Sequence, residues 1–203
     1  MKNLTILSCV MALMVVACSQ KAVQSQDNII MGTDDENLEA DYKIESSKFL
    51  KDKTNNDYRS DKSYDGKNDT AWCVGNNGVG EWIKFYFRPG PAYIREVLKG
   101  KRNVHKINIM NGFAANKKLY YENNRIKKMK VEFDEGERRI IEFKDGVFDY
   151  QSFKFNIRSK WVKLTILEIY KGTKYNDTCI SELDFRTIYD LSQDEIKKYK
   201  ESK

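Results

Sequence analysis

The sequence has few of the residues that nucleophilic and metal-dependent active sites need. Among 203 residues there is one histidine, His105, and only four cysteines. His105 lies in a strand pattern, where a structural role is expected. No pair of acidic residues is distinguished by its spacing, and the glycines from 75 to 80 precede a strand, so they lack the helix N-terminus of a phosphate loop. A Cys and His zinc centre is also disfavoured. We therefore expect a protein that is not an enzyme.

Proline is scarce, with two residues, and the composition is that of a globular protein, with 40% hydrophobic and 33% charged residues. Aromatic residues reach 12%, which favours sheet over helix. The net charge of +6 indicates mild attraction to acidic surfaces. No nucleic-acid-binding motif is present, so no nucleic-acid partner is expected.

The N-terminus has the pattern of a targeting segment. Lys2 precedes an apolar run, 4–16, that is too short to span a bilayer comfortably. Val15-Val16-Ala17-Cys18 resembles a bacterial lipobox, which implies cleavage before Cys18 and a lipid on its thiol. The alternative is a plain secretory signal with a chance cysteine. We assign 1–17 to the signal peptide and 18–45 to the lipidated cysteine and a flexible tether. The expected location is the bacterial cell envelope, lipid-anchored to a membrane, at the surface or in the periplasm.

The rest of the chain alternates short period-two segments with turns. The stretch 63–87 sets the pattern: an oxygen-rich turn from Asp65 to Thr70 leads through a glycine-broken loop into 82–87, where Ile83, Phe85 and Phe87 share one face. Further strands are expected at 104–110, 125–133, 138–143, 153–157, 161–170 and 179–185. Without a convincing central helix, this pattern predicts an all-β sandwich or jelly roll over 46–190.

The C-terminal residues 191–203 have a different pattern. Ser192 and Glu195 form the spacing of a capping box, which predicts a short helix that caps the sandwich.

Three blocks, 72–87, 107–133 and 164–185, resemble in order the NADase-type glycan-binding domain, a discoidin-like, galactose-binding-like domain. The resemblance spans roughly residues 50–188. It implies a discoidin-like jelly roll and glycan recognition, and it does not imply NADase activity, because that chemistry lies in a separate domain.

The same resemblance implies a structural calcium between the Asp-Gly turn and a C-terminal glutamate. The expected ligands are Asp65 and Thr70, main-chain oxygens near Lys62 and Lys67, and the pair Ser181 and Glu182. Related modules often carry Asn or Asp where this chain has Lys67, so one side-chain oxygen is missing. The alternative is a site without metal, held by hydrogen bonds or by the Lys67 ammonium.

Two cysteines remain after the signal and the lipidated residue are set aside. In a pair of antiparallel strands, the residue numbers of two directly opposed residues always add up to the same value. If Thr70 faces Glu182, that value is 252, and the residue numbers of Cys73 and Cys179 also add up to 252. The sequence therefore predicts a disulfide between Cys73 and Cys179, with two buried free thiols as the alternative.

Three polar-aromatic loops offer the chemistry of a sugar site, in which an aromatic ring covers a pyranose face and amide or guanidinium groups bind hydroxyls. The expected ligand-binding residues are Asn111, Phe113, Tyr120, Tyr121, Asn124, Arg125, Lys174, Tyr175 and Asp177. The alternative is that the tyrosines pack and that Arg125 pairs with Asp177.

The sequence thus predicts a lipid-anchored surface protein with a non-catalytic glycan-binding domain, whose glycan is of host or envelope origin. The alternative is an adhesion or assembly module on the same fold whose partner is a protein.

Overall fold

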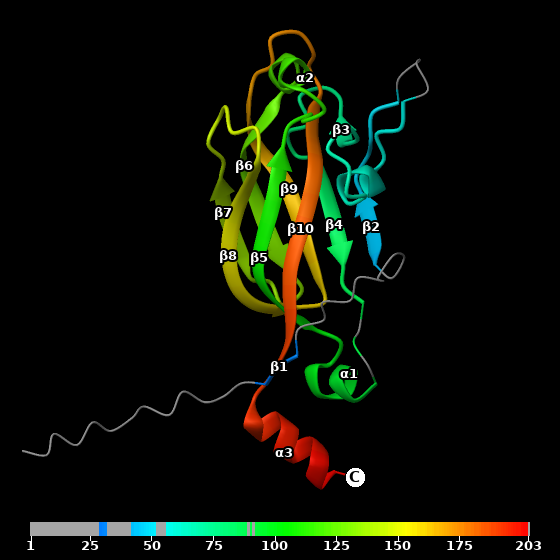
Figure 1. Ribbon diagram of the computed structural model, residues 1–203, viewed down its shortest axis with the longest axis vertical. Coiled ribbons are helices and arrows are strands. Elements are labelled where there is room, and N and C mark those ends of the chain that lie inside the picture. Colours follow the sequence, from blue (N-terminus) through cyan, green and yellow to red (C-terminus); the bar gives the residue numbers. More distant parts are fainter. Residues whose placement is uncertain (1–28, 32–41, 52–55, 89, 91, 203) are drawn as a thin grey trace, which may run out of the picture.

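The computed structural model describes residues 29–31, 42–51, 56–88, 90 and 92–202. These residues form two antiparallel sheets packed face to face (Figure 1). This is the predicted all-β sandwich with a short C-terminal helix. The signal segment 1–17, Cys18 and most of the range predicted as tether lie outside the described residues.

The first sheet is built around β10 (Thr178–Leu191), the longest strand. Its order is β1 (Ile29–Met31), β10, β5 (Arg102–Asn111) and β8 (Tyr150–Ser159), and β3 (Trp72–Val74) pairs with the first residues of β10. The second sheet has the order β2 (Lys43–Ser46), β4 (Trp82–Tyr86), β9 (Trp161–Tyr170), β6 (Arg125–Phe133) and β7 (Arg138–Glu142).

The core lies between the sheets and is filled by the apolar positions of the period-two segments. Ile83 and Phe85 of β4 are buried, and Leu164 and Val162 lie directly opposite them on β9. Trp72 of β3 is completely buried, and its indole Nε1 donates to the Lys48 carbonyl at 3.0 Å, so its polar atom is satisfied. Burial of each such large side chain contributes about 1.5–3 kcal/mol.

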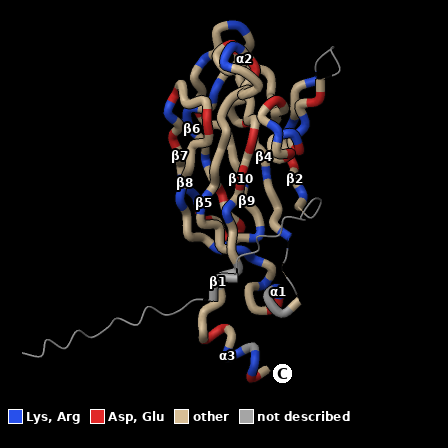
Figure 2. The backbone as a smooth tube through the Cα atoms, in the orientation of Figure 1, with Lys and Arg blue, Asp and Glu red and all other residues tan. Residues whose placement is uncertain are grey.

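Residues of both charge signs occur along the strands of the two sheets (Figure 2). On the outer face of the second sheet, the Lys128 ammonium lies 3.4 Å from Glu142 and 3.1 Å from Glu168 on the two flanking strands. Exposed cross-strand pairs of this kind contribute little individually. They keep the outer face of the sheet hydrophilic, which sets the inward direction of the apolar positions.

Helices cover the two ends of the sandwich. α2 (Lys117–Glu122) lies at one end, and α1 (Ala92–Leu98) and α3 (Gln193–Glu201) lie at the other (Figure 1). The predicted capping box is present, because Glu195 N donates to Ser192 Oγ at 3.2 Å and Ser192 N donates to Glu195 Oε2 at 2.8 Å. Arg158 of β8 also binds Glu195, which fixes the start of α3 against the sandwich.

Three parts of the sequence prediction need correction. β1 and all of β2 except Ser46 lie within the range 18–45, which was assigned to a tether, and both pair with strands of the sandwich. α1 and α2 were not anticipated. The segment 120–125, expected to be a loop, instead contains the end of α2, two linking residues and the first residue of β6. Each missed element has at most seven residues, too few for a clear periodicity.

Candidate functional site

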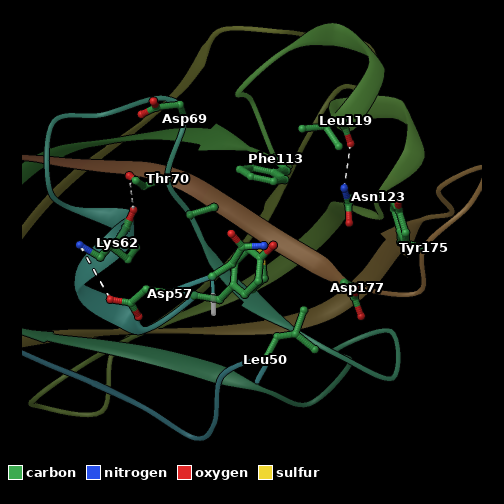
Figure 3. Close-up of a pocket in the computed structure, with 14 residues that line it drawn as sticks. Leu50, Asp57, Lys62, Asp69, Thr70, Phe113, Leu119, Asn123, Tyr175 and Asp177 are labelled. Atoms are coloured by element: carbon green, nitrogen blue, oxygen red, sulfur yellow. Dashed lines mark hydrogen bonds and ion pairs between the residues drawn. The ribbon is translucent and has the colours of Figure 1, made fainter. Parts of the chain in front are cut away.

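A pocket of about 820 Å³ opens at the α2 end of the sandwich (Figure 3). Its walls come from four parts of the chain: the segment around residues 50–58, the turn before β3, the α2 region and the loop between β9 and β10. The lining residues are Leu50, Asn56, Asp57, Tyr58, Lys62, Asp69, Thr70, Ala71, Cys73, Phe113, Leu119, Asn123, Tyr175 and Asp177.

Strand β3 forms one wall of the pocket and is held on both sides. Leu50 N donates to the Cys73 carbonyl at 2.7 Å, and Cys73 N donates to the Tyr58 carbonyl at 3.3 Å. On its other side, Cys73 is joined to Cys179 of β10 by a disulfide, with the two residues directly opposite in the register. The neighbouring pairs also sum to 252, as the sequence predicts.

The β9–β10 loop is fixed to α2 through main-chain hydrogen bonds. Lys174 N and Tyr175 N both donate to the Glu122 carbonyl, at 3.1 and 2.8 Å. Gly172 packs so tightly here that an added Cβ would lie 2.4 Å from the Glu122 carbonyl oxygen. The loop is therefore a preformed wall, which lowers the ordering cost of binding.

Three of the nine predicted ligand-binding residues line this pocket: Phe113, Tyr175 and Asp177. The Phe113 ring packs edge-on against the Tyr58 ring, with centroids 6.2 Å apart. Tyr175 is 38% exposed, and the Lys174 ammonium lies 4.6 Å from its ring centroid. The predicted residues Phe113, Lys174, Tyr175 and Asp177 have chemistry suited to a sugar, and their binding role stays a prediction.

Four other predicted residues are buried and serve the fold. Asn111 bridges to β6, donating to the Ile126 carbonyl and accepting from Ile126 N at 2.7 and 2.8 Å. Tyr120 is fully buried, and Asn124 accepts from Gly172 N at 2.9 Å. A ligand in the pocket described above does not meet these side chains, because they are not among its lining residues.

Arg125 is the fourth of these residues, and its partner is not Asp177, the one that the alternative interpretation gave it. It forms a two-pronged ion pair with Asp145, at 2.9 and 3.0 Å, rather than with Asp177. Only 5% of Arg125 is exposed. Tyr121 is 45% exposed but also lies outside the lining of the pocket.

Sequence reasoning missed the part of the pocket that comes from residues 50–58. Asp57 and Tyr58 combine a carboxylate with an aromatic ring, as the predicted loops do, and this signal was present in the sequence. Asn123 and Leu119 were missed because α2 was not recognised. The Asn116 side chain accepts from Leu119 N at 2.9 Å, an N-cap that marks the start of this helix.

The predicted calcium ligands converge beside the pocket, with one exception. Lys67 N donates to both Asp65 Oδ1 at 3.2 Å and Glu182 Oε1 at 3.0 Å, so the two carboxylates face the same point. Thr70 Oγ1 donates to Asp65 Oδ1 at 2.7 Å and lies 3.1 and 3.5 Å from the carbonyl oxygens of Lys67 and Lys62. The exception is Ser181, whose hydroxyl binds Ala114 N and the Gly112 carbonyl instead.

This donor set fits a hard cation. Asp65 Oδ2 is buried and has no hydrogen-bond partner among the described residues. Burial raises the pKa of Glu182 to about 7, opposed by the hydrogen bond from Lys67 N and reinforced by Asp65. Two carboxylates, a hydroxyl and main-chain carbonyls are ligands that calcium prefers. The ammonium nearest to Asp65 is that of Lys62, at 3.6 Å, and not that of Lys67.

Among the described residues, no group of three or more His, Cys, Asp or Glu side chains could hold a metal ion. Asp65 and Glu182 supply only two such side chains, so a cation here would depend on main-chain oxygens as well.

No helix in the described part of the chain has the length and apolar character needed to cross a membrane.

A family model described as the NAD glycohydrolase translocation F5/8 type C domain matches residues 37–186. The chain belongs to this family. The match covers both sheets apart from β1 and the end of β10, and F5/8 type C domains are the discoidin-like class that the sequence resembles. A comparison with curated proteins found no significant match.

Solved structures with a similar fold include several carbohydrate-binding modules. A module of Clostridium perfringens in complex with GalNAc-β-1,3-galactose shares 20% identity, with 71% of this chain and 94% of that chain covered and a TM-score of 0.48. An F5/8 type C domain from Bacteroides fragilis shares 17%, covering 74% and 93%, with a TM-score of 0.49. Truncated AlyQ, with CBM32 and alginate lyase domains, shares 11%, covering 72% and 32%, with a TM-score of 0.50. At these identities the likeness concerns the fold alone.

Proposed function

We propose that this chain is a non-catalytic glycan-binding domain, held by a lipid on Cys18 at a membrane of a bacterial cell envelope. The observation that carries the proposal is the pocket at the α2 end. It combines the rings of Tyr58, Phe113 and Tyr175 with carboxylate and amide groups on walls that the backbone already fixes. Aromatic faces bind the apolar side of a pyranose, and the polar groups bind its hydroxyls.

The position of the pocket is consistent with an anchored receptor. β1, the described strand closest to Cys18 in the sequence, pairs with the end of β10 at Leu191, whereas the pocket lies beyond the start of β10 at Thr178 (Figure 1). A chain anchored on its N-terminal side would therefore carry its pocket at the far end of the sandwich.

Exchange of Cys18 for serine should remove lipid labelling and release the protein from the membrane fraction. Continued partition of this variant into membranes would contradict the proposed lipid anchor.

We also propose that calcium occupies the point where Asp65 and Glu182 converge. This site lies beside Thr70 and Lys62, which line the pocket, so the ion would stabilise that wall. The ion's role here is structural, and no reaction is assigned to it. Calcium should raise the Tm of the purified protein by mass action. An unchanged Tm after chelation of calcium-loaded protein would contradict this assignment.

Binding is tested by a glycan array on the purified protein, followed by titration of the hits by nuclear magnetic resonance. A shallow sugar site should give a Kd in the micromolar to millimolar range, which multivalent display on a membrane would offset. Tyr175→Ala should weaken binding by about tenfold or more. Tyr150→Ala is the matched control, because Tyr150 is 40% exposed but does not line the pocket. Absence of any glycan-dependent shift would contradict the proposed function.

A further inference from the structure

Asp177 is a pocket carboxylate that no side chain or main-chain group in the described part of the chain binds. Its main chain is engaged, since the Asp177 carbonyl accepts from Asn124 N at 2.8 Å. Its side chain lines the pocket, is half-buried, and makes no hydrogen bond or ion pair with any residue that the structure describes. The carboxylate thus lies at the pocket wall, fixed by the backbone and available to a ligand (Figure 3).

The residues around Asp177 exclude part of the water from its carboxylate, and no described residue supplies a hydrogen-bond donor in place of that water. Gly75 packs beside this carboxylate, since a Cβ built on Gly75 would lie 3.6 Å from Asp177 Oδ1, and Leu50 Cδ1 would lie 3.5 Å from the same Cβ. Burial alone raises the pKa of Asp177 above its ordinary value. A partly desolvated acceptor of this kind gains most from a ligand that supplies a proton donor or a positive charge.

The other charges of the pocket do not neutralise Asp177. The Lys62 ammonium is shared among the carboxylates of Asp57, Asp61 and Asp65, at 4.0, 3.9 and 3.6 Å. Asp57 is in addition bound by the guanidinium of Arg59, at 2.9 and 2.8 Å. Lys62 is therefore the one cation among the lining residues, and its charge is already compensated. The nearby Lys174 ammonium lies over the Tyr175 ring, 4.6 Å from its centroid, and forms no ion pair with Asp177 in the described part of the chain.

Asp69 adds a further carboxylate at the rim of the pocket. It is exposed and has no ion-pair partner in the described part of the chain. With Asp177, it makes the pocket locally negative, although the whole chain has a net charge of +6. This local reversal of sign is a property of the pocket that the overall charge does not predict.

We propose that the pocket selects sugars by charge, with Asp177 as the specificity-determining residue: it binds a pyranose with a free amino group best, a neutral pyranose less well, and an acidic pyranose worst. This inference rests on the proposed glycan-binding function and names the class of ligand. The ammonium group of an amino sugar forms a charge-assisted hydrogen bond with the Asp177 carboxylate, and the ring lies against the aromatic walls. A uronic acid brings a further carboxylate into a pocket that already contains those of Asp177 and Asp69, and repulsion opposes its binding.

The test uses sugars that differ in charge on one ring. Galactosamine, galactose and galacturonate are titrated into the purified protein and followed by nuclear magnetic resonance, and glucosamine, glucose and glucuronate form a second series. In the wild type, the Kd of the amino sugar should be about tenfold or more below that of the uronic acid, a difference of about 1.4 kcal/mol. Asp177→Asn should reduce this ratio to about threefold or less while the neutral sugar keeps its affinity.

Asp69→Asn is the matched control, because the exposed Asp69 carboxylate should change the ratio less than Asp177 does. Thermal melting of each variant verifies that it is folded. If the uronic acid binds as tightly as the amino sugar, or if Asp177→Asn keeps the full ratio, selection by charge is refuted while glycan binding stands. If no sugar of either series binds, the proposed function itself fails, and the inference fails with it.

Discussion

Replacement of Arg125 by alanine separates a structural role from a binding role at the α2 end. The guanidinium is 5% exposed and holds Asp145 through two hydrogen bonds of 2.9 and 3.0 Å. It also donates to the Asn123 carbonyl at 2.9 Å, which joins the end of α2 to β6. Alanine removes all three bonds and leaves the Asp145 carboxylate without its counter-ion.

The expected loss of stability follows from the burial of the pair. Removal of one partner of a buried ion pair costs about 3–5 kcal/mol. The side chain of Asp145 is 39% exposed, so water recovers part of the loss, and we expect about 3 kcal/mol for Arg125→Ala. Arg125 also lowers the pKa of Asp145, chiefly through the hydrogen bonds, so the contribution is full above about pH 4 and declines as the pH falls through the lowered value.

Urea denaturation at pH 7 measures this loss, and a double-mutant cycle with Asp145→Ala isolates the part that belongs to the pair. Arg139→Ala is the control, because Arg139 pairs with Glu137 on the surface, where such pairs contribute about 0–1 kcal/mol. A stability loss below about 1 kcal/mol for Arg125→Ala, combined with lost glycan binding, would refute the reasoning and restore Arg125 as a ligand residue.

Three further predictions concern the disulfide, the carboxylate pair and a strained turn. Joint replacement of Cys73 and Cys179 by alanine should lower the free energy of unfolding, measured in urea, by about 4–5 kcal/mol, because the disulfide closes a loop across a sequence separation of 106 residues. A loss below about 1 kcal/mol would contradict this stabilising role of the disulfide. In the presence of a chelator, the wild type should lose stability as the pH rises from about 4.3 towards about 7, because Glu182 keeps its proton over that range in the native state and loses it in the unfolded state. Glu182→Gln should show a smaller change in Tm between pH 5 and pH 8. An equal change in both proteins would contradict the raised pKa of Glu182. Gly112→Ala should lower the free energy of unfolding by more than about 1 kcal/mol, because φ is +81° and the new Cβ would lie 2.9 Å from the Arg125 side chain. Gly136→Ala should lower it less, because φ is +85° but no atom lies near the new Cβ. Equal melting temperatures of the two variants would contradict the steric argument.

The strands could be predicted from sequence because burial of one sheet face imposes a period of two. Ile107 and Ile109, Val162 and Leu164 all point inward as expected. The constant sum of 252 also identified the partner of Cys73, since a register is a linear relation between residue numbers. These features depend on local pattern and simple geometry, which a sequence contains.

The candidate site was predicted only in part, for a physical reason. Asn111 and Arg125 have the chemistry of sugar-binding residues, but the same donors and acceptors satisfy buried main-chain groups, and residue type does not separate the two uses. The carboxylate and the ring of Asp57 and Tyr58 are visible in the sequence, but their position beside β3 is a tertiary contact that no local pattern reveals. Phe113 and Tyr175 were each expected to bind ligand, but their convergence could not be read from the sequence, and the structure places both on the pocket wall.

The bond between Cys73 and Cys179 turns most of the domain into a covalent ring. Everything from β4 to β9, with α1 and α2, lies inside that ring. A protease that cuts one exposed turn within it, such as the one at Gly136, leaves both pieces attached to each other. A cut before Cys73 or after Cys179 instead releases a peptide. A nicked molecule would therefore keep β3, which lines the pocket through Cys73, joined to β10.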